Sequence, residues 1–123
     1  MPCGGPGIGV AAAEEPAPRP PVREPTFLWL LTSAANGSVR FANLTCDPSG
    51  GSHPEADAAC RDLAAARGDF AKLPGDGGRA CPDVYAPVTA AAFGVWRGTP
   101  VTYGARYGNA CELSVTTGPV FQL

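Results

Sequence analysis

The sequence lacks the residues from which common catalytic and metal sites are built. It contains one histidine, His53, and none of its five cysteines is separated from another by only two residues. A zinc ribbon, a thioredoxin-type redox site and a histidine-rich metal site are therefore disfavoured. Because no set of nucleophile, base and orienting group is visible either, we expect no enzyme activity, no metal and no cofactor.

The sequence also lacks an excess of one charge and any long apolar segment. Nine basic residues nearly balance eleven acidic ones, whereas a nucleic-acid-binding protein needs a basic face. The longest apolar run, residues 27–31, is far shorter than the roughly 18 residues of a membrane span. We therefore expect no nucleic-acid partner and no membrane segment.

Glycine and proline are abundant, with 16 and 14 residues, so turns are expected to outnumber long helices. Residues 1–25 are so rich in both that we expect a disordered or polyproline-like N-terminal segment, followed by one folded domain over residues 26–123. Four cysteines of that domain predict two disulfides and an oxidising compartment, and Cys3 is left over. These cysteines are Cys46, Cys60, Cys81 and Cys111.

Apolar and alternating segments predict an antiparallel sheet. Asn36-Gly37 and Arg97-Gly98 each separate two such segments and are typical of tight hairpin turns. A final apolar stretch at the C-terminus adds a last short strand. The expected strands are residues 27–32, 39–45, 88–96, 99–107 and 119–123.

One helix is expected between the two hairpins. Ser52 and Glu55 have the spacing of a capping box, apolar residues then follow at helical spacing, and Gly68 is a plausible end. A short second helical turn is expected over residues 69–73. The predicted fold class is therefore α+β, with a five-stranded antiparallel sheet, a helix and a short second helix packed on one face, and two disulfides.

Four other side chains have a functional and a structural interpretation. His53 could be catalytic, but no nucleophile accompanies it, and a surface position at the start of the helix is the preferred interpretation. Trp96, Tyr103 and Tyr107 could form a ligand-binding face, but sheet core or a dimer interface is more usual for such residues.

The segment from Arg79 to Pro87 combines the features of a rigid exposed loop. It follows a glycine-rich stretch, and its two prolines, Pro82 and Pro87, favour extended backbone at the residues before them. A loop that is already ordered avoids much of the entropy cost of binding. Such a segment beside a disulfide suits a substrate mimic that a protease binds but releases slowly.

Several motifs together resemble the Streptomyces subtilisin inhibitor family, and the resemblance runs from about residue 27 to the C-terminus. They place the last four cysteines in a specific context. The motifs are Leu44-Thr-Cys46-Asp-Pro-Ser-Gly, Ala58-Ala-Cys60-Arg-Asp-Leu, Cys81-Pro-Asp-Val-Tyr-Ala-Pro87, Gly94-Val-Trp96-Arg-Gly98 and Asn109-Ala-Cys111-Glu.

The resemblance implies a five-stranded antiparallel sheet with two helices and a homodimer formed through the sheets. It implies the disulfides Cys46–Cys60 and Cys81–Cys111, and a scissile bond between Asp83 and Val84. The implied protease-contacting loop around that bond consists of Arg79, Ala80, Cys81, Pro82, Tyr85 and Ala86.

Asp83 departs from the family pattern, in which the residue entering the protease specificity pocket is usually Met, Leu, Lys or Arg. An ionised carboxylate is costly to bury in the apolar pocket of a subtilisin. Three alternatives follow. The target has a cationic pocket, as acid-specific glutamyl endopeptidases do; or binding is weaker and tightens as pH falls; or serine-protease inhibition is secondary.

The function expected from the sequence is that of a secreted inhibitor of serine endopeptidases, although no signal peptide is evident in this chain. The expected partner is a secreted serine protease of the subtilisin or glutamyl endopeptidase type. Alternatives are an inhibitor or binding partner of a small bacterial metalloprotease and a non-inhibitory protease-binding module.

Overall fold

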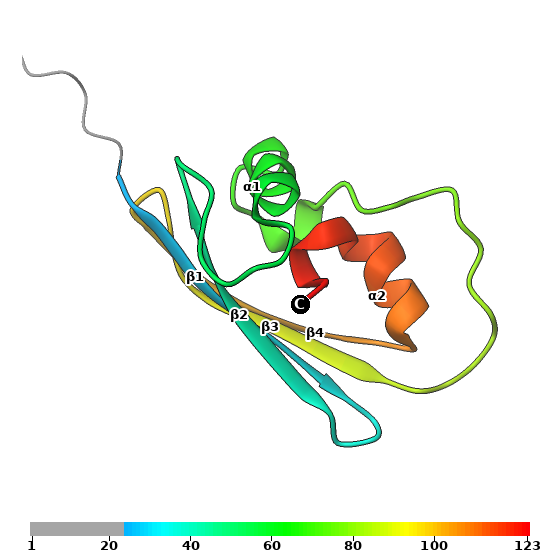
Figure 1. The fold of residues 1–123 in the computed structure, drawn as a ribbon. Helices are drawn as coiled ribbons and strands as arrows, with labels where there is room; N and C mark the ends of the chain where they lie inside the picture. Colours follow the sequence, from blue (N-terminus) through cyan, green and yellow to red (C-terminus); the bar gives the residue numbers. More distant parts are fainter. Residues whose placement is uncertain (1–23) are drawn as a thin grey trace, which may run out of the picture.

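A computed structural model describes residues 24–123 (Figure 1). The N-terminal segment expected to be disordered, including Cys3, lies outside these residues except for its last two positions. Four strands form one antiparallel sheet in the order β2-β1-β3-β4. The elements are β1 (Thr26–Ala34), β2 (Val39–Cys46), α1 (Ala56–Ala65), η2 (Phe70–Lys72), β3 (Val88–Trp96), β4 (Thr99–Tyr107), α2 (Ala110–Thr117) and η3 (Gly118–Phe121).

Two tight hairpins build the sheet, and both were predicted. The β1–β2 turn contains Gly37 at φ +88°, and the β3–β4 turn places Arg97 and Gly98 at φ +46° and +83°. These left-handed conformations match the twist of the flanking strands. β1 then pairs with β3 along its other edge, which closes the two hairpins into one sheet.

The prediction of five strands is wrong, since the part of the chain that the structure describes forms four. The expected last strand, residues 119–123, is mostly the 3-10 helix η3. Gly118 turns the chain at φ +61°, and Pro119 has no N–H to donate to a strand ladder. Val120 and Phe121 are instead buried in the core beneath α1.

Helix α1 is present as predicted, but its start differs. Glu55 precedes its first residue and no side chain caps it. The Ser52 hydroxyl accepts a hydrogen bond from the Asn43 backbone N–H (3.0 Å), and Asn43 Oδ1 accepts one from the Ser52 N–H (2.6 Å). The predicted capping box is therefore wrong, because Ser52 holds the loop before α1 against the edge strand β2.

His53 is buried, so the prediction of a surface position is also wrong. Its ring Nδ1 accepts a hydrogen bond from the Glu55 N–H (2.9 Å), which leaves Nε2 as the donor to the Val120 carbonyl (2.8 Å). Only 5% of its surface is exposed. The imidazole therefore joins the start of α1 to η3, with both ring nitrogens engaged by the backbone.

Both helices cover the same face of the sheet (Figure 1). The core lies between the helices and the sheet and contains Leu28, Leu30, Leu44 and Leu63, which are 0% exposed. Trp96 is buried in this core. Of the two structural interpretations of Trp96, Tyr103 and Tyr107, sheet core is therefore the correct one. Tyr103 and Tyr107 pack at the margin of the core, where their hydroxyls lie 2.8 Å apart.

The other face of the sheet carries aromatic side chains that no described residue covers. Phe41 and Phe93 are 68% and 52% exposed, and Phe27 and Trp29 lie beside them. Such a continuous apolar surface is unusual on a monomer and indicates an interaction site. Among residues 24–123, no helix is long and apolar enough to cross a membrane.

Candidate functional site

The segment between η2 and β3 forms a wide loop that projects from the body of the molecule (Figure 1). None of residues 74–87 is buried. The structure brings the predicted site residues together on this loop, with Val84 56% and Tyr85 75% exposed. Arg79, Ala80, Pro82, Asp83 and Ala86 are also exposed, and Cys81 is half-buried.

A disulfide holds the loop on the N-terminal side of Asp83. Cys81 is bonded to Cys111 in the first turn of α2, and Cys46 is bonded to Cys60, as the family resemblance implies. The Cys81–Cys111 disulfide is half-buried, and the Cys46–Cys60 disulfide is buried. The Cys81–Cys111 disulfide therefore fixes a point two residues before Asp83 to the start of a helix.

Asn109 supports the loop from beneath. Its Nδ2 atom donates hydrogen bonds to the carbonyl oxygens of Val84 (2.7 Å) and Pro82 (3.3 Å). Its Oδ1 atom accepts a hydrogen bond from the Glu112 N–H (2.9 Å), which caps α2. The buried amide thus uses both donors and its acceptor, and it contacts the backbone on both sides of Asp83.

A third contact holds the C-terminal side of the loop. The Ala86 N–H donates to the Gly108 carbonyl (2.8 Å), and the Gly108 N–H in turn donates to Glu112 Oε1 (3.2 Å). The disulfide, the Asn109 amide and this hydrogen bond all come from residues 108–111. Residues 108–111, at the junction of β4 and α2, therefore anchor the part of the exposed loop from Cys81 to Ala86.

The family resemblance implied two helices, as observed, but the residues alone indicated neither the position of α2 nor the anchoring role of Asn109. A signal for the helix was present, because Asn109 is followed three residues later by Glu112 and this spacing is typical of a helix N-terminus. No comparable signal identifies the contact between Asn109 and Val84, which are 25 residues apart.

Asp83 stands at the exposed centre of the loop. Within residues 24–123 its carboxylate makes no hydrogen bond or ion pair. Two arginines on or beside the loop contact other residues: Arg79 lies 4.0 Å from Asp76, and Arg106 Nη2 donates to the Tyr85 hydroxyl (3.4 Å). The Asp83 side chain is therefore free to enter a pocket of a binding partner.

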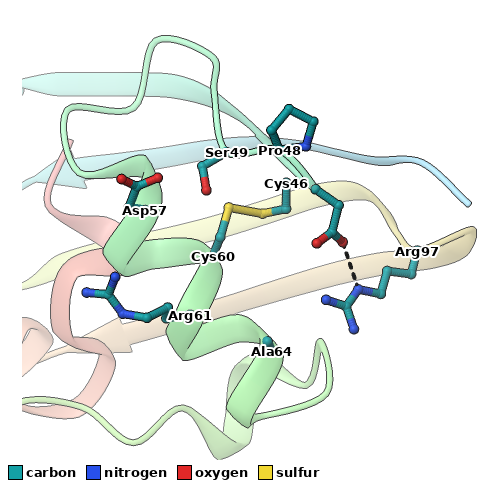
Figure 2. Close-up of a pocket in the computed structure, with 9 residues that line it drawn as sticks. Cys46, Pro48, Ser49, Asp57, Cys60, Arg61, Ala64 and Arg97 are labelled. Carbon is teal, nitrogen blue, oxygen red and sulfur yellow. Dashed lines mark hydrogen bonds and ion pairs between the residues drawn. A yellow bond between two sulfur atoms is a disulfide. The ribbon is translucent and has the colours of Figure 1, made fainter. Parts of the chain in front are cut away.

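A second candidate site is a pocket of about 290 Å³ beside the Cys46–Cys60 disulfide (Figure 2). It lies between the β2–α1 loop, α1 and the β3–β4 turn. Arg97 Nε donates to Asp47 Oδ2 at 3.0 Å at one end of the pocket. Since both cysteine sulfurs are bonded to each other, the pocket contains no thiol nucleophile, and its charged side chains are best explained as surface groups.

Two titratable groups away from the loop are shifted. Burial raises the pKa of Asp62 on α1, and the nearby Arg61 charge opposes this in part. Burial, and then the hydrogen bond with Tyr103, raises the pKa of Tyr107. Neither group belongs to the exposed loop.

Comparison with known proteins identifies relatives of the chain. The sequence profile of the family described as Subtilisin inhibitor-like matches residues 25–109. Subtilisin inhibitor-like protein 5 of Streptomyces fradiae is 46% identical over 84 residues, which are 68% of this chain and 78% of that protein. Subtilisin inhibitor-like protein 4 of Streptomyces lavendulae is 43% identical over 83 residues, 67% and 72% of the two chains.

A solved structure has the same fold. It is Streptomyces caespitosus sermetstatin in complex with Bacillus licheniformis subtilisin, with a TM-score of 0.64 and 28% identity over 80% of this chain and 99% of that one. The profile match covers more than half of the chain, and the relatives exceed 40% identity. The chain therefore belongs to the subtilisin inhibitor-like family.

Proposed function

We propose that this protein is a secreted inhibitor of serine endopeptidases that binds the protease active site through the loop around Asp83–Val84. The observation that carries the proposal is the anchoring of an exposed loop on both sides of one peptide bond. Family membership and the similarity to sermetstatin, which was solved in complex with subtilisin, support the same assignment.

The anchoring explains how a substrate-like loop can inhibit. A protease cleaves a flexible peptide and releases both fragments, because each product gains freedom on leaving. Here Cys81 is held by its disulfide, and Asn109 binds the Pro82 and Val84 carbonyls on either side of Asp83. After cleavage, the new amine of Val84 would stay close to the Asp83 acyl group, so religation would compete with hydrolysis.

Asp83 limits which protease is inhibited well. The exposed carboxylate would lose its water on entering an apolar pocket, which costs several kcal/mol unless it is paired or protonated. A pocket with a basic residue would compensate this loss through a charge-assisted hydrogen bond. We therefore propose that the preferred target is an acid-specific protease of the glutamyl endopeptidase type.

The test is a set of inhibition constants for the wild type and Asp83→Met against subtilisin, trypsin, a glutamyl endopeptidase and a small neutral metalloprotease, at two pH values. We expect Asp83→Met to inhibit subtilisin at least about tenfold more tightly than the wild type does. The same variant should inhibit the glutamyl endopeptidase less tightly than the wild type does. Asp57→Met, which makes the same change at an exposed position of α1 away from the loop, is the matched control.

Equal inhibition of subtilisin by the wild type and Asp83→Met would contradict the proposed role of Asp83. Inhibition of the metalloprotease alone, or binding of a serine protease without loss of its activity, would contradict the proposed function. Mass spectrometry of the complex adds a direct measurement, since cleavage is expected only between Asp83 and Val84.

We also propose that the protein is a homodimer formed through the uncovered face of the sheet. A second copy would bury the exposed aromatic side chains of Phe27, Trp29, Phe41 and Phe93, and a two-fold axis through this face would bring the same residues together from both copies. Sedimentation of Trp29→Arg is expected to give a monomer where the wild type is a dimer, because buried like charges would then oppose each other. A dimeric Trp29→Arg variant would exclude this face.

A further inference from the structure

Arg106 lies beside the part of the loop that follows the Asp83–Val84 bond, although it is 21 residues from Tyr85 in sequence. It stands near the end of β4, opposite Thr89 of β3. Its Nη2 atom donates a hydrogen bond of 3.4 Å to the Tyr85 hydroxyl. Since Tyr85 is 75% exposed, this contact belongs to the outer surface of the loop rather than to the core.

The guanidinium of Arg106 keeps its positive charge unpaired within residues 24–123. Arg79 and Arg97, by contrast, lie within 4.0 Å of Asp76 and Asp47. A guanidinium carries five N–H donors, and only the bond to Tyr85 occupies one of them here. Arg106 therefore has several donors available to a protein that binds over Tyr85.

The backbone next to Arg106 is firmly placed. Gly108, two residues later, accepts the hydrogen bond of the Ala86 N–H, and Asn109 donates to Val84. Residues 84–86 are thus aligned with the end of β4. The Arg106 side chain reaches the hydroxyl of Tyr85, which lies between the two anchored residues Val84 and Ala86. Asp83 and Arg106 consequently place opposite charges before and after the scissile bond.

We infer that Arg106 is a specificity-determining residue of the inhibitory surface, an inference that rests on the function proposed above. It positions the Tyr85 ring, and it carries a positive charge into the surface that a protease contacts after the cleavage point. Proteases with carboxylates on that side are favoured, and proteases with basic side chains there are disfavoured, because complementary charges increase the association rate and like charges oppose binding.

The experiment compares Arg106→Gln and Arg106→Glu with the wild type, against subtilisin and a glutamyl endopeptidase at low and high salt. The same series is made in an Asp83→Met background, so that subtilisin inhibition can be measured even where Asp83 weakens it. Arg40→Gln and Arg40→Glu are the matched controls, since Arg40 is exposed on the opposite edge strand β2.

With at least one protease, the inhibition constant is expected to change by about three- to tenfold from the wild type to Arg106→Gln, and again from Arg106→Gln to Arg106→Glu. These changes should be smaller at high salt. The Arg40 substitutions should change the inhibition constant by less than about twofold. If the wild type or Asp83→Met inhibits a protease and the Arg106 substitutions leave the inhibition constants unchanged, this inference is overturned and the proposed function stays intact. Absence of inhibition in both backgrounds would instead overturn the proposed function, and this inference with it.

Positioning of Tyr85 is tested separately by a double-mutant cycle with Tyr85→Phe, which removes the hydroxyl and keeps the ring. The effects of Arg106→Gln and Tyr85→Phe on inhibition are expected to be non-additive, because both changes break the same contact. Strictly additive effects would overturn the positioning role. Thermal melts of every variant verify that the fold is retained.

Discussion

The sheet with α1 and the loop of residues 74–87 are both ordered, but by different means. In the first region, order comes from packing, because Leu28, Leu30 and Leu63 are completely buried. The loop contributes no buried residue, and its order comes from a disulfide and a few hydrogen bonds to residues 108–115. A binding surface can therefore be kept rigid and exposed at once, provided that its backbone is attached at several points.

The largest expected effect is on the packed region. Leu63→Ala removes a completely buried side chain of α1 and is expected to lower the free energy of unfolding by about 3–5 kcal/mol. Urea denaturation measures this. Val84→Ala, at an exposed position of the loop, is the control and should change it by less than about 0.5 kcal/mol. Comparable losses in the two variants would mean that the loop is packed after all.

Removal of each disulfide is expected to separate stability from function. The Cys46–Cys60 and Cys81–Cys111 bonds span 14 and 30 residues, and the chain-entropy model assigns them about 3 and 4 kcal/mol. Both Cys→Ser double variants should lose stability. Only the Cys81→Ser/Cys111→Ser protein should be hydrolysed by the target at Asp83–Val84, as followed by mass spectrometry. Equal resistance of both proteins to cleavage would contradict the anchoring role of the Cys81–Cys111 disulfide.

Asn109→Asp is expected to affect the loop and spare α2. The carboxylate can still accept the Glu112 N–H and cap the helix, but it cannot donate to the carbonyls of Pro82 and Val84. We expect the inhibition constant to rise about 10- to 100-fold, corresponding to the loss of a buried hydrogen-bonded contact. Circular dichroism should show unchanged helix content. Unaltered inhibition would mean that the Cys81–Cys111 disulfide and the Ala86–Gly108 hydrogen bond order the loop without Asn109.

The smallest expected effect concerns Asp62 and pH. Because burial raises its pKa in the folded protein above the ordinary value of 3.8, this carboxyl favours folding below pH 3.8 and ceases to do so as pH rises through the folded pKa. Asp62→Asn should therefore raise the melting temperature by about 1–3 °C at pH 7 and not at pH 3. Asp76→Asn in the exposed loop is the comparison, and a gain that persists at pH 3 would exclude ionisation as the cause.

The packed region was the easier one to predict from the sequence. Alternating apolar residues and the turns at Asn36-Gly37 and Arg97-Gly98 depend on neighbours in the chain, so both hairpins were located correctly. Errors arose where tertiary contacts override local signals. Ser52 has the pattern of a helix cap but bonds to Asn43, and His53 looks polar and exposed but is enclosed by the backbone of Glu55 and Val120.

The site was predictable only in part. Two prolines and a cysteine indicated a rigid loop around Asp83, and the structure places that loop at the surface. The contacts that order it could not be foreseen, because Asn109 and Gly108 are separated from Val84 and Ala86 by more than 20 residues. Apart from the spacing of Asn109 and Glu112 at its start, α2 had no clear helical pattern in the sequence, because it contains β-branched residues such as Val115 and Thr116.

The contacts of Asn109 with the loop backbone leave the residue at position 83 open to exchange. Asn109 and Gly108 bind the main-chain carbonyls of Pro82 and Val84 and the amide of Ala86, and they make no use of the side chain at position 83. A new residue can therefore be exchanged at that position without rebuilding its support. Single substitutions at position 83 can therefore change which protease is bound while the scaffold stays the same, both in evolution and in a designed library.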